Sequence, residues 1–223
     1  GDYKRIDPLL GCEEDFRALC SEATRRGMRV VLDGVFNHTG YDSRYFNARG
    51  HYDSVGAFQS KESPYFSWFD FHNWPNEYGS WWGIYTLPQV NESDGSYQDY
   101  IIEDEDSVVR RWLRLGASGW RLDVAADLGK TEEFNHAFWR IFRTAVNSVS
   151  PDKLILAEHY GDAAPWLTGN QWDSIMNYDA FMEPVTWFLT GVSKHSTEKR
   201  EDMYNNADVF WGTMSYQMGR LPS

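Results

Sequence analysis

Short apolar runs that end in polar residues constrain the fold of this 223-residue chain most. They are rich in Val, Leu and Ile over most of their length, as is typical of parallel strands buried on both faces. The runs span residues 28–36, 119–124 and 153–158, with a weaker one at 174–179. Stretches of helical periodicity alternate with them, at residues 13–26, 104–115, 131–150 and 181–189. Four strand and helix units of this kind predict an α/β fold with a parallel sheet.

Polar residues gather where the predicted strands end. In a (β/α)8 barrel, the carboxyl ends of the strands form the edge where catalytic groups lie. An open doubly wound sheet would also bind ligands at that edge, but no Gly-x-Gly-x-x-Gly follows any of these strands. The TIM barrel is therefore the favoured fold. The polar residues at the predicted edge are Asp33, Asn37, His38, Arg121, Asp123, Glu158, His159, Asn177 and Asp179.

A long stretch without periodicity interrupts the alternation. From Gly40 to Asp99, Gly, Pro, Asn, Ser and aromatic residues dominate. Structureless loops of about 60 residues are uncommon inside compact domains, so we interpret this stretch as a small inserted subdomain. The predicted organisation is a barrel segment at 1–39, an inserted B subdomain at 40–98 and a second barrel segment at 99–223.

Charge and composition exclude several classes of partner. The net charge is −12 and the basic residues are scattered, which argues against nucleic acid. No stretch approaches the roughly 18 apolar residues of a membrane span, and the first residues show no signal-peptide pattern. We therefore expect a soluble protein, cytoplasmic or secreted, that binds neither nucleic acid nor membrane. Aromatic residues make up 17% of the chain, which suits packing in a core and also stacking on sugar rings.

Arg121 and Asp123 form the most informative pair. They lie two residues apart in a predicted strand, so their side chains point to the same side. A cation so close favours the charged form of a carboxyl group, which predicts that Asp123 stays ionised at neutral pH. Taken alone, this pair has an ordinary alternative reading as a structural ion pair.

Four stretches match one pattern when they are taken in order. They are DGVFNH at residues 33–38, LPQVN at 87–91, GWRLD at 119–123 and AE at 157–158. The first, third and fourth resemble signatures of the α-amylase family, glycoside hydrolase family 13. The second is similar to a Met/Leu-Pro-Lys-Leu-Asn run of the neopullulanase, cyclomaltodextrinase and amylopullulanase branch. The resemblance covers essentially the whole chain.

The resemblance implies a retaining glycosidase that hydrolyses α-1,4 bonds of starch-like α-glucans. Whether it also hydrolyses α-1,6 bonds is left open. Retention requires two carboxyl groups about 5–5.5 Å apart, and neighbouring strand ends lie about 4.8 Å apart. Asp123 is the expected nucleophile, held ionised by Arg121. Glu158 follows an apolar run and faces that anion, so a raised pKa and a general acid/base role are expected.

Further residues receive roles from the same resemblance. His38 resembles the family histidine that hydrogen-bonds the sugar in the cleavage subsite, and His159 and Trp82 are further candidate substrate contacts. Asp33 resembles a structural aspartate. Asn37 matches a position that binds calcium in some α-amylases, but one amide oxygen cannot define a site that requires six to eight oxygens. No cofactor is expected to be required, and calcium is left open.

The chain departs from the family pattern in two places. The third catalytic acid, an aspartate after a histidine at the seventh strand, has no match. The first two strands are expected to lie before Gly1. We therefore interpret the chain as an internal piece, strands three to six of eight with the B insertion. Unpaired strand edges predict that this piece alone is inactive and prone to aggregation.

Two alternative functions remain open at this stage. The same machinery could perform transglycosylation, isomerisation or branching, because a sugar or water can resolve the same covalent intermediate. A non-catalytic amylase-like protein, acting as a glucan-binding or interaction module, is the alternative from another class. Such relatives typically lack a carboxylate, whereas Arg121, Asp123 and Glu158 are all present. The expected partner is an α-glucan oligosaccharide or polysaccharide, and the oligomeric state is left open.

Overall fold

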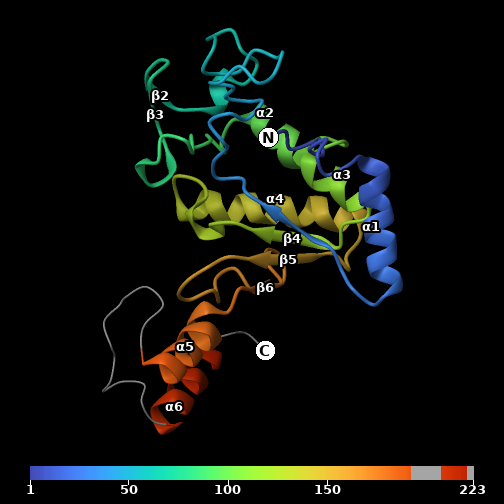
Figure 1. The fold of residues 1–223 in the computed structure, drawn as a ribbon. Helices are drawn as coiled ribbons and strands as arrows, with labels where there is room; N and C mark the ends of the chain where they lie inside the picture. Colours follow the sequence, from blue (N-terminus) through green and yellow to red (C-terminus); the bar gives the residue numbers. More distant parts are fainter. Residues whose placement is uncertain (192–206, 220–223) are drawn as a thin grey trace.

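A four-stranded parallel sheet forms the centre of the molecule. The computed structural model describes residues 1–191 and 207–219 (Figure 1). The strands lie in the order β1-β4-β5-β6. Their bounds are β1 (Val31–Gly34), β4 (Gly119–Leu122), β5 (Leu154–Ala157) and β6 (Ser174–Ile175). The four predicted strands are confirmed, although each is shorter than its apolar run.

The strand register brings the polar ends together. Asp33 of β1 pairs with Arg121 of β4, and Leu122 pairs with Ala157 of β5. The ladder continues one step beyond the strands, because the N–H of Glu158 donates to the carbonyl of Leu122 at 2.8 Å. All three strands therefore end at the same level of the sheet.

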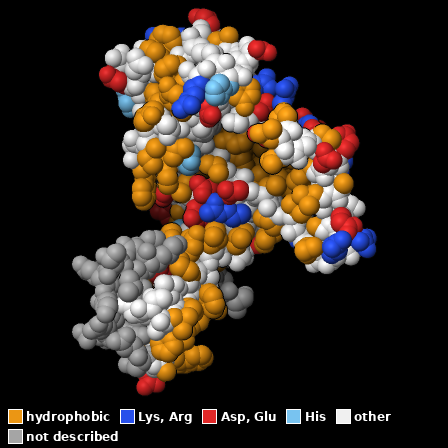
Figure 2. Space-filling view, in the orientation of Figure 1, with side chains coloured by type: hydrophobic (Ala, Val, Ile, Leu, Met, Phe, Trp, Pro, Cys, Tyr) orange, Lys and Arg blue, Asp and Glu red, His pale blue; other side chains and the backbone are white. Residues whose placement is uncertain are grey.

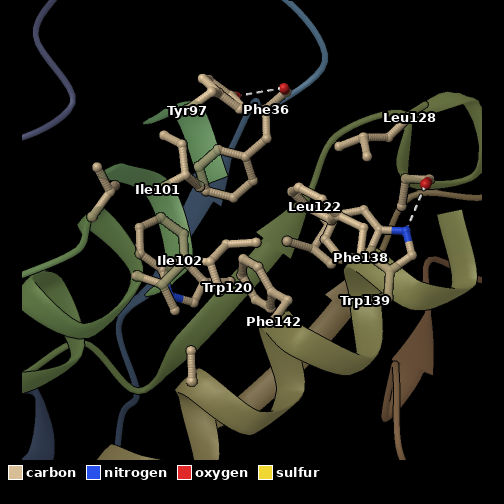
Figure 3. Packing of buried hydrophobic residues seen from close by; sticks show 14 of the residues in the cluster. Phe36, Tyr97, Ile101, Ile102, Trp120, Leu122, Leu128, Phe138, Trp139 and Phe142 are labelled. Atoms are coloured by element: carbon tan, nitrogen blue, oxygen red, sulfur yellow. Dashed lines mark hydrogen bonds between the residues drawn. The ribbon is translucent and has the colours of Figure 1, made fainter. Parts of the chain in front are cut away.

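Three helices pack around the sheet (Figure 1). They are α1 (Glu13–Arg25), α3 (Val108–Leu115) and α4 (Glu132–Val149). As predicted, Thr131 begins α4, with its hydroxyl accepting from the N–H of Phe134 at 3.2 Å. Figure 3 shows Phe138 and Phe142 of α4 against Trp120 and Leu122 of β4, and all four are buried. The amphipathic face of α4 thus covers the strand that carries Arg121.

Further helical segments precede α3, follow β4 and follow β6. They are α2 (Gly95–Gln98), η3 (Asp99–Glu103), η4 (Ala125–Asp127), η5 (Tyr178–Met182), α5 (Glu183–Thr190) and α6 (Ala207–Met218). The helix predicted at residues 181–189 is confirmed as α5. The sequence predicted no element for the final residues, where α6 lies. No described helix is long and apolar enough to cross a membrane.

Residues 40–98 contain little regular structure apart from a two-stranded antiparallel sheet. Its strands are β2 (Phe71–Asn73) and β3 (Glu77–Tyr78), and two short helices, η1 (Phe66–Trp68) and η2 (Trp81–Gly83), flank them. Aromatic rings supply the packing, and this cluster is continuous with the core around the sheet. Tyr97 joins the two regions, because its hydroxyl donates to the carbonyl of Phe36 at 2.7 Å (Figure 3). The division at residues 39 and 98 stays a prediction.

The prediction that the first strand is buried on both faces is wrong. Val31 and Leu32 are only partly buried and Asp33 is exposed. The reason is the position of β1, which is the edge strand of the described sheet. A cavity of about 640 Å³ runs beside it, with Leu32, Phe36 and Trp120 in its lining.

Candidate active site

Arg121 is the centre of a charged cluster at the carboxyl edge of the sheet. Its Nη1 lies 2.8 Å from Asp33 Oδ1 and 2.6 Å from Asp123 Oδ1, and its Nη2 lies 3.0 Å from Glu158 Oε2. One guanidinium therefore contacts carboxylates from three strand ends. Acidic and basic side chains lie side by side near the centre of the face shown in Figure 2. The cluster carries more negative than positive charge.

The shared arginine limits the distance between the two predicted catalytic acids. Asp123 contacts Nη1 and Glu158 contacts Nη2, and both nitrogens are bonded to one carbon atom. The contacting oxygens therefore lie no more than about 8 Å apart. Glycosidases place their two carboxyl groups roughly 5 to 9.5 Å apart. The structure thus brings the two acids together, as the strand order predicts.

Val124 forms a tight turn directly after the predicted nucleophile. It has φ 41° and ψ 44°, a left-handed conformation that is rare for a β-branched residue. This turn directs the Val124 N–H toward Glu158 Oε2 at 3.2 Å. Such local strain often accompanies functional sites because it fixes a donor where a regular strand could not. Trp139 supports the turn, since its Nε1 donates to the carbonyl of Ala125 at 2.9 Å (Figure 3).

The prediction of a raised pKa for Glu158 is wrong for this arrangement, whereas the ionisation of Asp123 at neutral pH stays a prediction. Burial alone would raise the pKa of Glu158, and the Val124 N–H opposes burial most. Contacts with Asp123, Arg121 and Tyr178 lower the pKa further, so the pKa of Glu158 lies below its ordinary value. Burial raises the pKa of Asp123, and the nearby Glu158 carboxyl raises it further. Arg121 lowers this pKa only in part, so the net pKa is raised. The donors on Glu158 could not be read from the sequence.

An aromatic cleft of about 370 Å³ opens beside the two acids. The insertion contributes stacked indoles, with the rings of Trp81 and Trp82 5.1 Å apart at 20°. Trp82 is 82% exposed, so most of its ring surface faces solvent. The lining residues are Trp81, Trp82, Asp123, Val124, Ala126, Asp127, Glu158, His159 and Tyr160. A cleft with exposed rings and carboxylates offers both stacking and hydrogen bonding to a sugar.

The two predicted histidines occupy different positions. His159 lines the cleft, and its Nε2 lies 3.2 Å from the carbonyl oxygen of Asp162. His38 is buried and does not line the cleft; its ring stacks on Trp81 at 5.1 Å and 19°. Burial lowers the pKa of His38, which favours the neutral ring. His38 therefore supports a wall of the cleft through Trp81 in this structure.

Sequence reasoning missed Tyr178 and Tyr160. The Tyr178 hydroxyl donates to Glu158 Oε1 at 3.1 Å, and the two tyrosine rings stack at 4.3 Å. The sequence predicts Asn177 and Asp179 as the polar residues at this end of β6. These side chains instead accept from backbone N–H groups, Asn177 from Ala180 and Asp179 from Gly161. The position of Tyr178 between these two polar residues, directly after β6, was the sequence signal that could have identified it.

Calcium binding by Asn37 stays a prediction. The Oδ1 of Asn37 is buried and has no hydrogen-bond partner, and the Nδ2 of Asn37 lies 3.4 Å from His38 Nδ1. Within residues 1–191 and 207–219, no group of three or more His, Cys, Asp or Glu side chains could hold a metal ion. Calcium requires six to eight oxygen ligands, and one amide oxygen falls far short of that.

The fold and the site together define an α/β protein with paired acids at the carboxyl edge of a parallel sheet. The chain belongs to the α-amylase family, whose catalytic-domain model, "Alpha amylase, catalytic domain", matches residues 1–210. The sheet is accordingly part of a (β/α)8 barrel, as predicted.

Named relatives agree with this family. Over 210 residues the chain is 39% identical to an amylopullulanase of Thermoanaerobacterium saccharolyticum, covering 86% of the chain and 16% of that protein. Over 218 residues it is 35% identical to a cyclomaltodextrinase of Thermoanaerobacter pseudethanolicus (strain ATCC 33223 / 39E), covering 93% and 35%. Among solved structures, a cyclic α-maltosyl-(1→6)-maltose hydrolase from Arthrobacter globiformis matches with TM-score 0.79 and 30% identity, covering 100% and 45%. The chain thus spans less than half the length of each of these relatives.

Proposed function

We propose that this protein is a retaining α-glucan hydrolase that cleaves α-1,4 and α-1,6 glucosidic bonds. The observation that carries the proposal is the shared guanidinium of Arg121, which brings Asp123 and Glu158 to one edge of an aromatic cleft. The names of the relatives support the substrate class, because amylopullulanase, cyclomaltodextrinase and a maltosyl-(1→6)-maltose hydrolase are all named for α-glucans.

In the proposed reaction, the Asp123 carboxylate attacks the anomeric carbon while Glu158 gives a proton to the leaving oxygen. The bond to that oxygen breaks, and a covalent glycosyl-enzyme forms on Asp123. Glu158, now a carboxylate, takes a proton from a water molecule that attacks the same carbon and releases the sugar. Asp123 must therefore be ionised and Glu158 protonated when the reaction starts.

The second requirement runs against the pKa of Glu158 in the free site. Burial raises that pKa, but the Val124 N–H and the contacts with Asp123, Arg121 and Tyr178 outweigh burial, so the pKa lies below its ordinary value. We infer that substrate in the cleft raises the pKa of Glu158 and so favours the protonated acid. The sugar would displace solvent from the pair, and the leaving oxygen would give a proton on Glu158 an acceptor.

The proposed binding surface is the aromatic wall of the cleft. The exposed face of Trp82 and the ring of Tyr160 lie at the cleft with the acids. Rings of this kind bind the apolar faces of glucose units, while polar groups such as His159 and Asp127 give hydrogen bonds to hydroxyls. His38 is proposed to contribute indirectly, by holding Trp81 in place.

The test is hydrolysis of maltohexaose and pullulan by the full-length protein, with the anomeric configuration of the first products followed by NMR. We expect retained α products from both substrates. Glu158→Gln should lower the rate on maltohexaose by about 10²–10⁴-fold, the usual contribution of a general acid/base. Glu103→Gln, which changes an exposed carboxyl outside the cleft, is the matched control and should keep the wild-type rate.

Three results would count against the proposal. Inverted products would exclude a covalent intermediate, and full activity of Glu158→Gln would exclude its acid role. Products longer than the substrate as the main outcome would favour transglycosylation over hydrolysis.

A further inference from the structure

The two oxygens of Glu158 have different partners. Oε2 accepts from the Val124 N–H at 3.2 Å and from Arg121 Nη2 at 3.0 Å. Both donors have hydrogens fixed by planar groups, so they fill the acceptor positions of that oxygen. Oε1 is instead 3.1 Å from the hydroxyl of Tyr178, whose hydrogen can rotate. A proton that Glu158 is to transfer must therefore reside on Oε1.

The ring of Tyr178 is held in place, and its hydroxyl has acceptors in two directions. Tyr178 begins η5, and the side chain of Asn177 caps that segment at the N–H of Ala180, 3.2 Å away. Tyr160 stacks on the ring at 4.3 Å and 17°. The hydroxyl also has a second acceptor, the Met176 sulfur at 3.5 Å. One phenol oxygen thus faces both a carboxyl oxygen and an alternative site for its hydrogen.

We propose that Tyr178 is a positioning residue for proton transfer by Glu158, an inference that rests on the function proposed above. When Glu158 is ionised, the phenol donates to Oε1. When Glu158 is protonated, the phenol hydrogen turns to Met176 and the phenol oxygen accepts from Oε1. The proton then passes from Oε1 to the leaving glycosidic oxygen as its bond to carbon breaks, and the phenol hydrogen returns to the new carboxylate. No other group gains or loses a proton in this step.

The charged groups around Glu158 determine in which direction its pKa moves when the Tyr178 hydroxyl is removed. Arg121 and Asp123 face it from the end of β4, and Tyr178 faces it from η5. His159 follows it in the chain. Burial and the nearby Glu158 charge raise the pKa of Tyr178, so the phenol remains a donor over the working range. Removing its hydroxyl takes one donor from the Glu158 anion and leaves Arg121 and Val124 in place.

The kinetic test compares Tyr178→Phe with the full-length wild-type protein on two substrates. Maltohexaose needs a proton on its leaving oxygen, whereas α-maltosyl fluoride hardly needs one. We expect kcat/KM to fall about tenfold on maltohexaose and less than threefold on the fluoride, and the alkaline limb of the pH profile to move up by about one pH unit. Tyr52→Phe in the insertion is the matched control. Equal losses on both substrates with an unchanged pH profile would overturn the proposal.

A second measurement needs no substrate. The Glu158 carboxyl, labelled with ¹³C and assigned with Glu158→Gln, should titrate about one pH unit higher in Tyr178→Phe than in wild type. If Tyr178→Phe does not fold, 3-fluorotyrosine at position 178, a stronger donor, should lower the titration instead. An unchanged titration would overturn the role of Tyr178. If the wild type cleaves neither substrate, the proposed function fails, while this titration still decides whether Tyr178 controls the Glu158 proton.

Discussion

Two arginine–carboxylate clusters of this molecule contrast in charge. At the sheet edge, one arginine, Arg121, contacts three carboxylates. Near the start of the chain, one carboxylate, Asp2, contacts Arg44 at 2.9 Å and Arg5 at 3.7 Å. The Asp2 side chain is 4% exposed and opens on no acid-lined cleft, whereas Asp123 is 21% exposed and lines one. Carboxylates thus outnumber arginines at the sheet edge, whereas arginines outnumber carboxylates around Asp2.

The pKa values of the two aspartates move in opposite directions for that reason. Burial raises the pKa of Asp2, but the N–H of Lys4, Arg44 and the Tyr45 hydroxyl outweigh it, and the net pKa is lowered. Burial also raises the pKa of Asp123, and there Arg121 is divided among several acids while Glu158 adds repulsion, so the net pKa is raised. An excess of carboxylates over cations therefore distinguishes a site of proton chemistry from a structural ion pair.

The largest effect expected from this comparison concerns Asp123→Asn. Replacing the proposed nucleophile should lower kcat on maltohexaose by about 10⁴-fold, a loss typical of removing an essential catalytic group. The free energy of unfolding should stay equal or rise slightly, because the change removes one of three crowded carboxylates around Arg121. Steady-state hydrolysis and thermal melting of the full-length protein measure the two effects.

Asp2→Asn is the matched change in the balanced cluster. It leaves the partly exposed Arg44 with a weaker partner at the buried position of Asp2 and should lower the free energy of unfolding by about 2 kcal/mol while kcat stays near wild type. The contrast fails if Asp2→Asn abolishes hydrolysis, or if Asp123→Asn destabilises the protein as much as Asp2→Asn does.

Arg121→Lys should produce the second largest effect. A lysine presents one point charge, so it cannot replace the separate Nη1 and Nη2 contacts to Asp123 and Glu158. We expect kcat to fall about 10²-fold, because the two acids lose their common anchor and misplacement by about 1 Å can cost that much. The same exchange at Arg44 is the control and should change kcat less than about twofold. Similar losses in both variants would show that Arg121 has no special role in catalysis.

The sequence predicted the part of the site that strand register controls. Arg121, Asp123 and Glu158 follow apolar runs, and in a parallel sheet in register such residues reach the same edge. The helix α4 was equally visible, since Thr131 and the spacing of its apolar residues determine its start and buried face.

Contacts that depend on irregular backbone could not be predicted in this way. Tyr178 reaches Glu158 only because η5 begins directly after β6, and the Val124 N–H reaches it only through a left-handed turn. These two donors contribute to the lowered pKa of Glu158, for which the sequence predicts a raised one. The stacking of His38 on Trp81 likewise depends on the path of the insertion, for which the sequence shows no periodicity. Propensity and spacing describe regular elements and carry little information about such turns.

Glu92 extends the comparison to a buried carboxyl that no arginine contacts among the described residues. It is 4% exposed, its Oε1 has no hydrogen-bond partner, and burial raises its pKa to about 7. The backbone N–H of Gly129 and the charge of Lys130 oppose burial only in part, and Lys130 also pairs with Asp70 at 2.8 Å. Burial therefore sets the pKa of Glu92, whereas at Asp2 arginine helps to outweigh the same effect of burial.

Stability should depend on pH through Glu92 with a definite sign. Below about pH 4.5 the carboxyl is protonated in both the folded and the unfolded chain. As the pH rises toward 7, the unfolded chain loses this proton first, so the free energy of unfolding falls, and above 7 the penalty is constant. Glu92→Gln stays neutral and should therefore match wild type near pH 4 and exceed it by about 3 kcal/mol at pH 8. Denaturant unfolding across this range, with exposed Glu62→Gln as the control, measures the difference. A gain that is the same at every pH would instead mean that the glutamine improves packing, and that Glu92 carries no buried charge for an arginine to offset.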